Sequence, residues 1–271
     1  MISNYASNYG EWSETEVDLY KLLLRNDSNV LEIGANMGLH TIPLSKICHA
    51  GTIICFEPQP PIYHILCGNI ALNNRLNILA YNKAVGEHNE FINIPVSSYD
   101  KPWNYGSFSV ESGYNKEGDY FSQSVSQSRY QSIEMVSIDS VLKNSPLHID
   151  LIKIDVEGHE MKCLQGACNT ITKNRPAIFC EAVEKDVTEK VAVFLGHLGY
   201  EGFWFLNNRY RNDNFLACPV QMHNKLSYDI NIIFLHSADS SPSAEFCRRQ
   251  LVKYHSFDQL TEGLPVLSSF I

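Results

Sequence analysis

Two acidic residues next to apolar runs are the first side chains of this sequence that could bind a ligand. Glu32 lies in the run of residues 30–33, just before Gly34, and Glu57 follows the run of residues 53–56. The two hydroxyls of a ribose are donors, and one carboxylate can accept both. In nucleotide-binding α/β folds, an acid about 20 positions after the glycine turn does this. We therefore expect Glu57 to hold a ribose, with Pro58 ending the strand because proline has no N–H.

The glycines after the first run indicate which nucleotide that would be. Gly34 and Gly38 let the backbone come close to a ligand, and the helix expected after them begins with free N–H groups. A dinucleotide fingerprint needs three glycines, but Ala35 and Asn36 stand where that pattern would continue. The Glu32 carboxylate would also repel a pyrophosphate. A ligand with an amine and no phosphate fits better, and S-adenosylmethionine (SAM) is such a ligand.

A second group of reactive side chains follows the apolar run of residues 149–154. Asp155, Glu157 and His159 surround the turn at Gly158, and Glu181 follows the run of residues 177–180. Open α/β sheets bind their ligands at the carboxyl ends of the strands, so these groups should face one pocket. Asp155 could contact SAM, accept a hydroxyl proton, or bind a divalent cation together with Glu157 or Glu181. His159 could be the general base at neutral pH.

The elements that position these residues alternate between strands and helices. The first helix is expected at residues 13–25, with Ser13 and Glu16 forming a capping box. Lys153, within a strand, is expected to be structural or to pair with a nearby carboxylate. Apolar runs predict strands at residues 30–33, 51–58, 76–81, 133–138, 149–154, 177–180, 201–206 and 230–235.

The chain divides into three parts, and the middle part contains a segment of different composition. We expect an N-terminal helical cap at residues 1–28, a core at 29–236 and an appended tail at 237–271. Within the core, residues 97–132 are rich in serine and aromatic residues. This segment is either a surface insertion or a lid over a substrate such as a sugar.

Composition disfavours several classes of protein. The net charge of −9 argues against nucleic acid as a partner, since phosphate binding needs clustered Lys and Arg. No apolar run is long enough to span a bilayer, and the first 12 residues have no signal-peptide core. The eight cysteines show no metal-ligand spacing. We therefore expect the protein in the reducing cytoplasm.

Three segments taken together resemble the FkbM family of SAM-dependent methyltransferases. They are Leu-Glu-Ile-Gly-Ala-Asn-Met-Gly-Leu-His-Thr at residues 31–41, Phe-Glu-Pro-Gln-Pro at 56–60 and Ile-Lys-Ile-Asp-Val-Glu-Gly-His-Glu at 152–160. The resemblance covers residues 29–236. It implies an α/β fold of the class I methyltransferase type, a Rossmann-like seven-stranded sheet, mostly parallel with the last strand antiparallel, and helices on both faces. Glu32 departs from the aspartate more often found at its position, but it keeps the charge.

The resemblance also implies an activity, O-methylation of a hydroxyl on a sugar, glycan or small metabolite. With it, the expected cofactor-binding residues are Glu32, Gly34, Ala35, Asn36, Gly38, Thr41, Glu57, Pro58, Asn82, Ala84 and Asp155. The turn at residues 82–85 would border the adenine. Candidate catalytic residues are Asp155, His159 and Glu181.

Two other functions remain open at this point. An NAD-dependent oxidoreductase could use a similar sheet, although the middle glycine is missing. A non-catalytic binding module is the other alternative, although it would have no need of the set Glu32, Gly34, Gly38, Glu57 and Asp155. The acceptor and the oligomeric state do not follow from the sequence.

Overall fold

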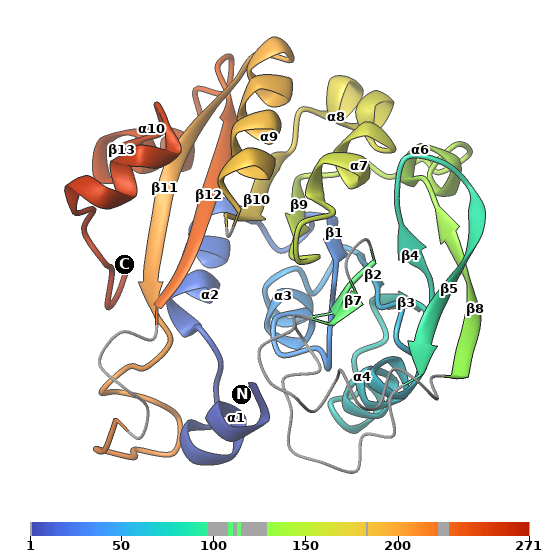
Figure 1. The fold of residues 1–271 in the computed structure, drawn as a ribbon. Helices are drawn as coiled ribbons and strands as arrows, with labels where there is room; N and C mark the ends of the chain where they lie inside the picture. The colour runs from blue at the N-terminus through green and yellow to red at the C-terminus, as the bar shows by residue number, and fades with distance from the viewer. Residues whose placement is uncertain are drawn as a thin grey trace.

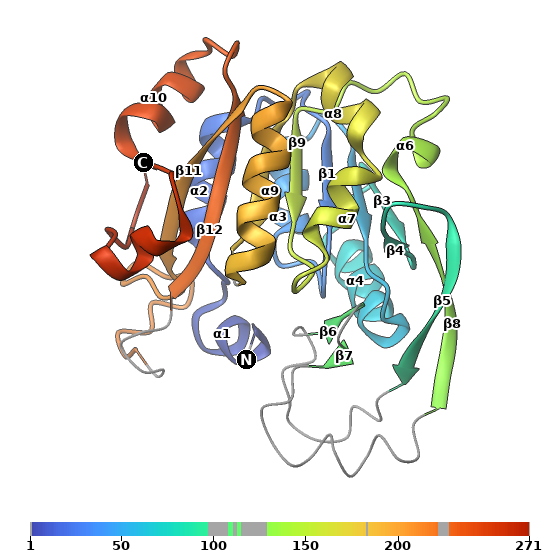
Figure 2. The same ribbon diagram turned by 45° about the horizontal axis from the view of Figure 1, so that its top comes forward.

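An eight-stranded sheet with helices on both faces forms the centre of the molecule (Figures 1 and 2). The computed structural model describes residues 2–96, 108–110, 113–114, 129–182, 184–221 and 228–270. Across the sheet the strands follow the order β13-β11-β12-β10-β9-β1-β2-β3. Their bounds are β1 Val30–Ile33, β2 Ile53–Phe56, β3 Ile78–Tyr81, β9 Leu151–Ile154, β10 Ala177–Glu181, β11 Tyr200–Asn208, β12 Tyr228–His236 and β13 Val252–Lys253.

Strand direction confirms the predicted class of fold. The pairs β1–β2, β2–β3, β1–β9 and β9–β10 are parallel, whereas β12 runs antiparallel to both β10 and β11. The seven strands from β3 to β11 therefore form the expected sheet, with the last of them in the chain antiparallel. The two-residue strand β13, from the segment expected as a tail, adds an eighth strand at the edge beside β11.

Two layers of helices cover the sheet because its buried strands are apolar on both faces. The helices α2, α3, α4 and α10 pack on one face and enclose Val30, Ile53 and Phe179. On the other face, α7, α8 and α9 enclose Leu31, Ile54 and Ile152. Helix bounds are α1 Ile2–Tyr9, α2 Glu14–Leu23, α3 Thr41–Ile47, α4 Pro60–Leu72, α6 Ile138–Val141, α7 Glu160–Gln165, α8 Cys168–Asn174, α9 Lys185–His197 and α10 Pro242–Gln250.

A second, three-stranded sheet lies beside the large one and was not expected from the sequence. The turn predicted at residues 82–85 contains β4 (Ala84–Val85), which pairs with β8 (Arg129–Val136). Strand β8 also pairs with β5 (Glu90–Val96). A short pair, β6 (Phe108–Ser109) with β7 (Gly113–Tyr114), follows β5. Most of residues 97–132 lie outside the described residues, and with them the choice between a surface insertion and a lid.

The capping box predicted at Ser13 is wrong. The Ser13 side chain makes no capping hydrogen bond, and its backbone adopts a left-handed conformation with φ 46°. Its hydroxyl instead donates to Asp229 of β12. Glu16 accepts hydrogen bonds from Tyr20 Oη and from Asn231 Nδ2. A partner more than 200 residues away thus displaces the local cap.

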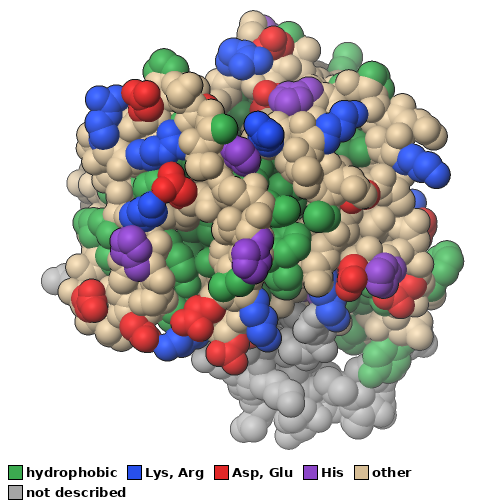
Figure 3. Space-filling model, turned by 90° about the horizontal axis from the view of Figure 1, so that it is seen from above, with side chains coloured by type: hydrophobic (Ala, Val, Ile, Leu, Met, Phe, Trp, Pro, Cys, Tyr) green, Lys and Arg blue, Asp and Glu red, His purple; other side chains and the backbone are tan. Residues whose placement is uncertain are grey.

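The cysteines, the helices and the surface charges can each be compared with what the sequence predicted. All eight cysteines are free thiols. Among the described helices, none is long and apolar enough to cross a membrane. On the described part of the face seen from above, basic and acidic side chains are interspersed rather than gathered by sign (Figure 3).

Candidate functional site

A cavity opens at the carboxyl ends of β1, β2, β9 and β10. Parallel pairing places Ile33, Phe56 and Ile154 side by side at the ends of their strands. The residues that follow must therefore meet at one edge of the sheet. The cavity is lined by Gly34, Ala35, Asn36 and Met37 after β1, Glu57, Pro58 and Gln59 after β2, and Asp155, Val156 and Glu157 after β9. Glu181 at the end of β10 and Asp229 and Asn231 of β12 complete that edge.

Gly34 has a different function from the one its motif indicated. Its φ is +87°, and a Cβ on it would lie 1.9 Å from the carbonyl oxygen of Asp155. Glycine is therefore required so that the turn after β1 can pack against the backbone after β9. The Asp155 N–H closes the same contact by donating to Ile33 O at 3.0 Å. Gly34 thus brings the residues after β1 next to those after β9.

Glu57 lies at the end of β2 with its carboxylate fixed from two sides. Its Oε2 accepts a hydrogen bond from Asn36 N (3.0 Å), and its Oε1 accepts one from Gln59 N (2.9 Å). The Gln59 side chain also hydrogen-bonds to this carboxylate, which leaves one of its roughly four acceptor sites for a further donor. Burial raises the pKa of Glu57 from 4.5 to about 7, although the two backbone hydrogen bonds lower it. The carboxylate is positioned to accept a hydroxyl group in the cavity.

Glu32 and Lys153 form a buried pair across the central strands. They are directly opposite in the β1–β9 register, and each is at most 2% exposed. Thr41 Oγ1 donates to Glu32 Oε2 at 2.6 Å, and Lys153 Nζ donates to Asp155 Oδ2 at 3.2 Å. Burial raises the pKa of Glu32 to about 7, although Lys153 lowers it. Burial lowers the pKa of Lys153, but Asp155, Glu32 and Glu16 raise it above its usual value. The predicted pairing of Lys153 with a carboxylate is confirmed.

The acidic groups on the β9–β10 side repel one another. Burial, followed by Asp155 and Glu160, raises the pKa of Glu157 to about 8. Burial, followed by Asp155 and Glu157, raises the pKa of Glu181 well above its usual value. Glu181 Oε2 is buried with no hydrogen-bond partner among the described residues. Within the same residues, no group of three or more His, Cys, Asp or Glu side chains could hold a metal ion. A cation bound by Asp155, Glu157 and Glu181 stays a prediction.

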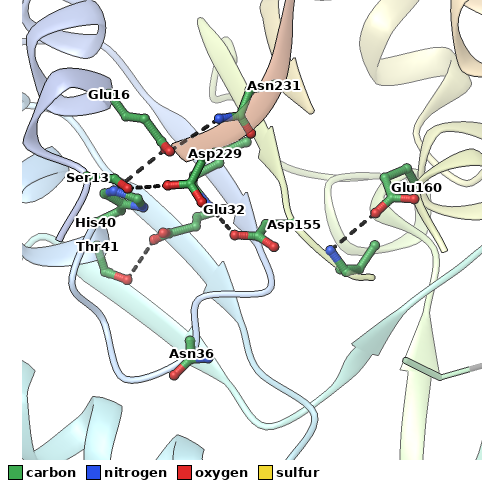
Figure 4. Close-up of polar contacts among 12 residues, drawn as sticks. Ser13, Glu16, Glu32, Asn36, His40, Thr41, Asp155, Glu160, Asp229 and Asn231 are labelled. Carbon is green, nitrogen blue, oxygen red and sulfur yellow. Dashed lines mark hydrogen bonds and ion pairs between the residues drawn. The ribbon is translucent and has the colours of Figure 1, made fainter. Parts of the chain in front are cut away.

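Sequence reasoning missed one wall of the cavity. Glu16, His40, Arg209, Asp229 and Asn231 line it beside Glu32. Figure 4 shows Glu16, His40 and Asp229 grouped on one side of Glu32, with Asp155 on the other. Arg209 donates from Nε to Asp229 Oδ1 (2.6 Å) and stacks over the Trp12 ring at 5.2 Å. These residues come from both ends of the chain, so no local motif could have grouped them.

Five predicted site residues do not line the cavity. Thr41 and Asn82 support the acids, since Asn82 Nδ2 donates to the carbonyls of Glu57 and Pro58. Gly38 has φ +90° and packs near Leu66, and Ala84 is buried in β4. His159 is the N-terminal residue before α7 and is 3% exposed. The structure therefore does not place the predicted general base at the cavity.

The strand order and the position of this cavity define a class I methyltransferase fold. Among solved structures, the precorrin-6y C5,15-methyltransferase of Geobacter metallireducens is similar, with a TM-score of 0.50 and 15% identity over 82% of this chain and 87% of that one. That likeness concerns the fold alone. The model of the methyltransferase FkbM domain matches residues 32–201, more than half of the chain. The protein belongs to the FkbM methyltransferase family, as its motifs predicted.

Two relatives show how far the similarity extends. The 2-O-methyltransferase NoeI of Sinorhizobium fredii is 27% identical over 175 residues, which cover 63% of this chain and 70% of NoeI. Methyltransferase sdnD of Sordaria araneosa is 25% identical over 153 residues, 51% of this chain and 59% of sdnD. The chain thus spans less than two thirds of the length of sdnD.

Proposed function

We propose that this protein is a SAM-dependent methyltransferase that methylates a hydroxyl group of a sugar, glycan or small metabolite. The observation that carries the proposal is the buried carboxylate of Glu57. It faces the cavity beside the turn after β1, in a chain of the FkbM family. SAM bound there would supply an electrophilic methyl group.

The residues of the cavity suit the functional groups of SAM. Glu57 would hold the ribose by accepting a hydroxyl, because its oxygens keep a free lone pair after binding Asn36 N, Gln59 N and the Gln59 side chain. Glu32 and the backbone after Gly34 would hold the amino acid end. The described lining of the cavity holds two cations, Lys153 and Arg209, and seven acidic residues, whose ionised carboxylates would attract the sulfonium cation: Glu16, Glu32, Glu57, Asp155, Glu157, Glu181 and Asp229. Phosphate groups would be repelled, which disfavours NAD.

A hydroxyl acceptor is supported by the chemistry of the second half of the cavity. Glu181, Asp229 and Asn231 offer oxygen acceptors to hydroxyl groups, and Trp12 adds an aromatic ring to the lining. The relative NoeI is itself a 2-O-methyltransferase. An anionic acceptor would meet the same repulsion as a phosphate. We therefore expect a neutral polyol or glycoside.

Calorimetric titration with S-adenosylhomocysteine (SAH) and, separately, with NAD tests the cofactor. We expect micromolar affinity for SAH and none for NAD. Binding of NAD alone would contradict the proposal in favour of an oxidoreductase, and binding of neither would favour a non-catalytic module.

Transfer of a labelled methyl group from SAM tests the acceptor class. Neutral methyl glycosides with a free 2-hydroxyl would be compared with their 2-O-methylated counterparts. We expect labelling of free hydroxyls only. Labelling confined to amines or to anionic compounds would contradict O-methylation of a neutral acceptor.

A further inference from the structure

The wall that sequence reasoning missed contains a histidine with an available ring nitrogen. We call this histidine and four residues around it the His40 cluster: Ser13, Glu16, His40, Asp229 and Asn231. His40 is 6% exposed and lines the cavity. Its Nε2 has no hydrogen-bond partner among the residues that the structure describes. A buried polar atom without a partner is costly unless a ligand satisfies it.

The surroundings of His40 select one tautomer of its ring. The ring makes hydrogen bonds to the backbone of Trp12 and Ser13. Because Nε2 has no partner, these bonds come from Nδ1, which must carry the hydrogen. Nε2 then keeps a free lone pair; the atom is buried beside Glu16, in a residue that lines the cavity. The edge contact with the Tyr20 ring, at 5.9 Å and 87°, also restricts the ring orientation.

The remaining members of the cluster hold this arrangement in place. The backbone of Ser13, which bonds to the His40 ring, is in the left-handed conformation. The Ser13 hydroxyl donates a hydrogen bond to Asp229. Glu16 Oε2 lies 3.6 Å from His40 Nε2 (Figure 4). Tyr20 Oη and Asn231 Nδ2 each donate a hydrogen bond to Glu16, at 3.1 Å and 3.3 Å. The carboxyl group is therefore fixed next to the nitrogen.

We propose that His40 Nε2, supported by Glu16, accepts the proton of the acceptor hydroxyl during methyl transfer. This inference rests on the proposed function. The O–H bond of the acceptor breaks and its proton passes to Nε2, while an oxygen electron pair forms the new C–O bond. The S–CH₃ bond breaks, and sulfur keeps its electron pair. The positive charge lost by the sulfonium reappears on an imidazolium next to the Glu16 carboxyl group.

The other candidates for this task are placed less favourably. His159 does not line the cavity. Asp155 is ion-paired with Lys153 at 3.2 Å. Burial, followed by Asp155 and Glu157, raises the pKa of Glu181 well above its usual value, which favours the protonated form over the ionised form that could take a proton. Among these four, His40 alone combines a lone pair, burial and a fixed orientation.

The charges around His40 and Glu16 predict the pH above which the two residues can take up the proton of the acceptor. Burial, followed by Lys153, holds the pKa of His40 well below 6.5. Burial, followed by Asp229, raises the pKa of Glu16 to about 8. At neutral pH the pair therefore carries one proton, on Glu16, and loses it near pH 8. The groups that face the pair are Lys153 and Asp155 from the β9 side, Asp229 from β12 and Tyr20 from α2.

Nitrogen NMR of the histidine side chains tests the tautomer without any acceptor. The spectrum of the SAH complex would be recorded at pH 8.5, and the His40 signals assigned by their loss in His40→Gln. We expect hydrogen on Nδ1 and none on Nε2. Hydrogen on Nε2, or on both nitrogens, would overturn the proposal.

Kinetics with a glycoside that the protein methylates test the proton transfer. We expect His40→Gln to lower kcat by about 10²- to 10⁴-fold and to change SAH affinity by less than about twofold. Glu16→Gln should remove the rise of kcat/KM near pH 8. His159→Gln is the matched comparison and should keep kcat. The proposal fails if His159→Gln loses kcat and His40→Gln does not.

Failure of the proposed function would be recognisable separately. Binding of SAH without methylation of any glycoside would contradict the proposed acceptor class. The NMR spectrum would still show which ring nitrogen of His40 carries the hydrogen, and hydrogen on Nε2 would overturn the inference. A His40→Gln variant that no longer binds SAH would assign His40 to cofactor binding instead and would overturn the inference.

Discussion

Replacing Glu57 with glutamine should weaken SAH binding and make it less sensitive to pH. A ribose hydroxyl is expected to bind the ionised carboxylate, and a hydrogen bond to a charged group contributes about 1.5–3 kcal/mol. An amide keeps one acceptor oxygen, so we expect a loss of about 1.5–3 kcal/mol, or roughly 10- to 150-fold in Kd.

The pKa of Glu57 sets the pH range of the effect. With a pKa of about 7 in the ligand-free protein, the carboxyl group is mostly protonated at pH 6 and mostly ionised at pH 8. If only the ionised form binds, SAH affinity falls as the pH drops below 7, by about tenfold between pH 8 and pH 6. Glu57→Gln cannot ionise and should lose this part of the pH dependence.

Calorimetric titration with SAH at pH 6, 7 and 8 would measure both effects. Glu87→Gln is the control, because Glu87 is an exposed acid outside the cavity. The unfolding temperature must be recorded too, since the amide nitrogen of glutamine would face the N–H of Asn36 or Gln59. Unchanged affinity in Glu57→Gln, or a pH dependence equal to that of the wild type, would refute the ribose assignment.

Two further predictions concern stability. Gly34→Ala should reduce the free energy of unfolding by more than about 2 kcal/mol, because the new Cβ meets Asp155 O and φ is +87°. Urea denaturation would measure this loss, with Gly68→Ala in α4 as the control. A Cβ at Gly68 meets no atom within 4 Å, so this variant should be more stable than the wild type by about 0.5–1 kcal/mol. Equal stability of the two variants would contradict the packing argument. Lys153→Met should cost about 3–5 kcal/mol at pH 7.5, because it leaves Glu32 buried without its cation. Urea denaturation at that pH measures the loss of unfolding free energy, and Lys46→Met, at the C-terminal end of α3, is the control. A loss below about 1 kcal/mol in Lys153→Met would show that Glu32 is neutral without Lys153.

Sequence alone was sufficient for the half of the site that follows the parallel strands. Glu32, Glu57, Asp155 and Glu181 each stand at or just after an apolar run, and parallel pairing brings the ends of such runs together. The pattern therefore predicted both the strands and their meeting point. Its account of Gly34 was incomplete, because the sequence does not show which backbone the glycine must approach.

The other half of the site could not be predicted because its contacts join distant segments. Ser13 and Glu16 fitted a local capping rule, yet their partners are Asp229 and Asn231 of β12. His159 was a candidate base because it stands in an acidic motif, whereas His40 was not considered; the packing of α2 against α3 puts His40 at the cavity.

The contacts between α2 and β12 also affect the order of events during synthesis. Glu16 and Asn231 are 215 positions apart, and Ser13 and Asp229 are 216 apart. A ribosome completes the turn after β1 early, but the wall that contains His40 gains its last members only when β12 emerges. A nascent chain could therefore form much of the sheet before this wall of the cavity is complete. The long loop closed by these contacts costs only slightly more entropy than a loop half its length, about 0.6 kcal/mol per doubling. The completed cavity therefore requires synthesis to have passed residue 231, whereas the turns after β1, β2 and β9 can assemble earlier.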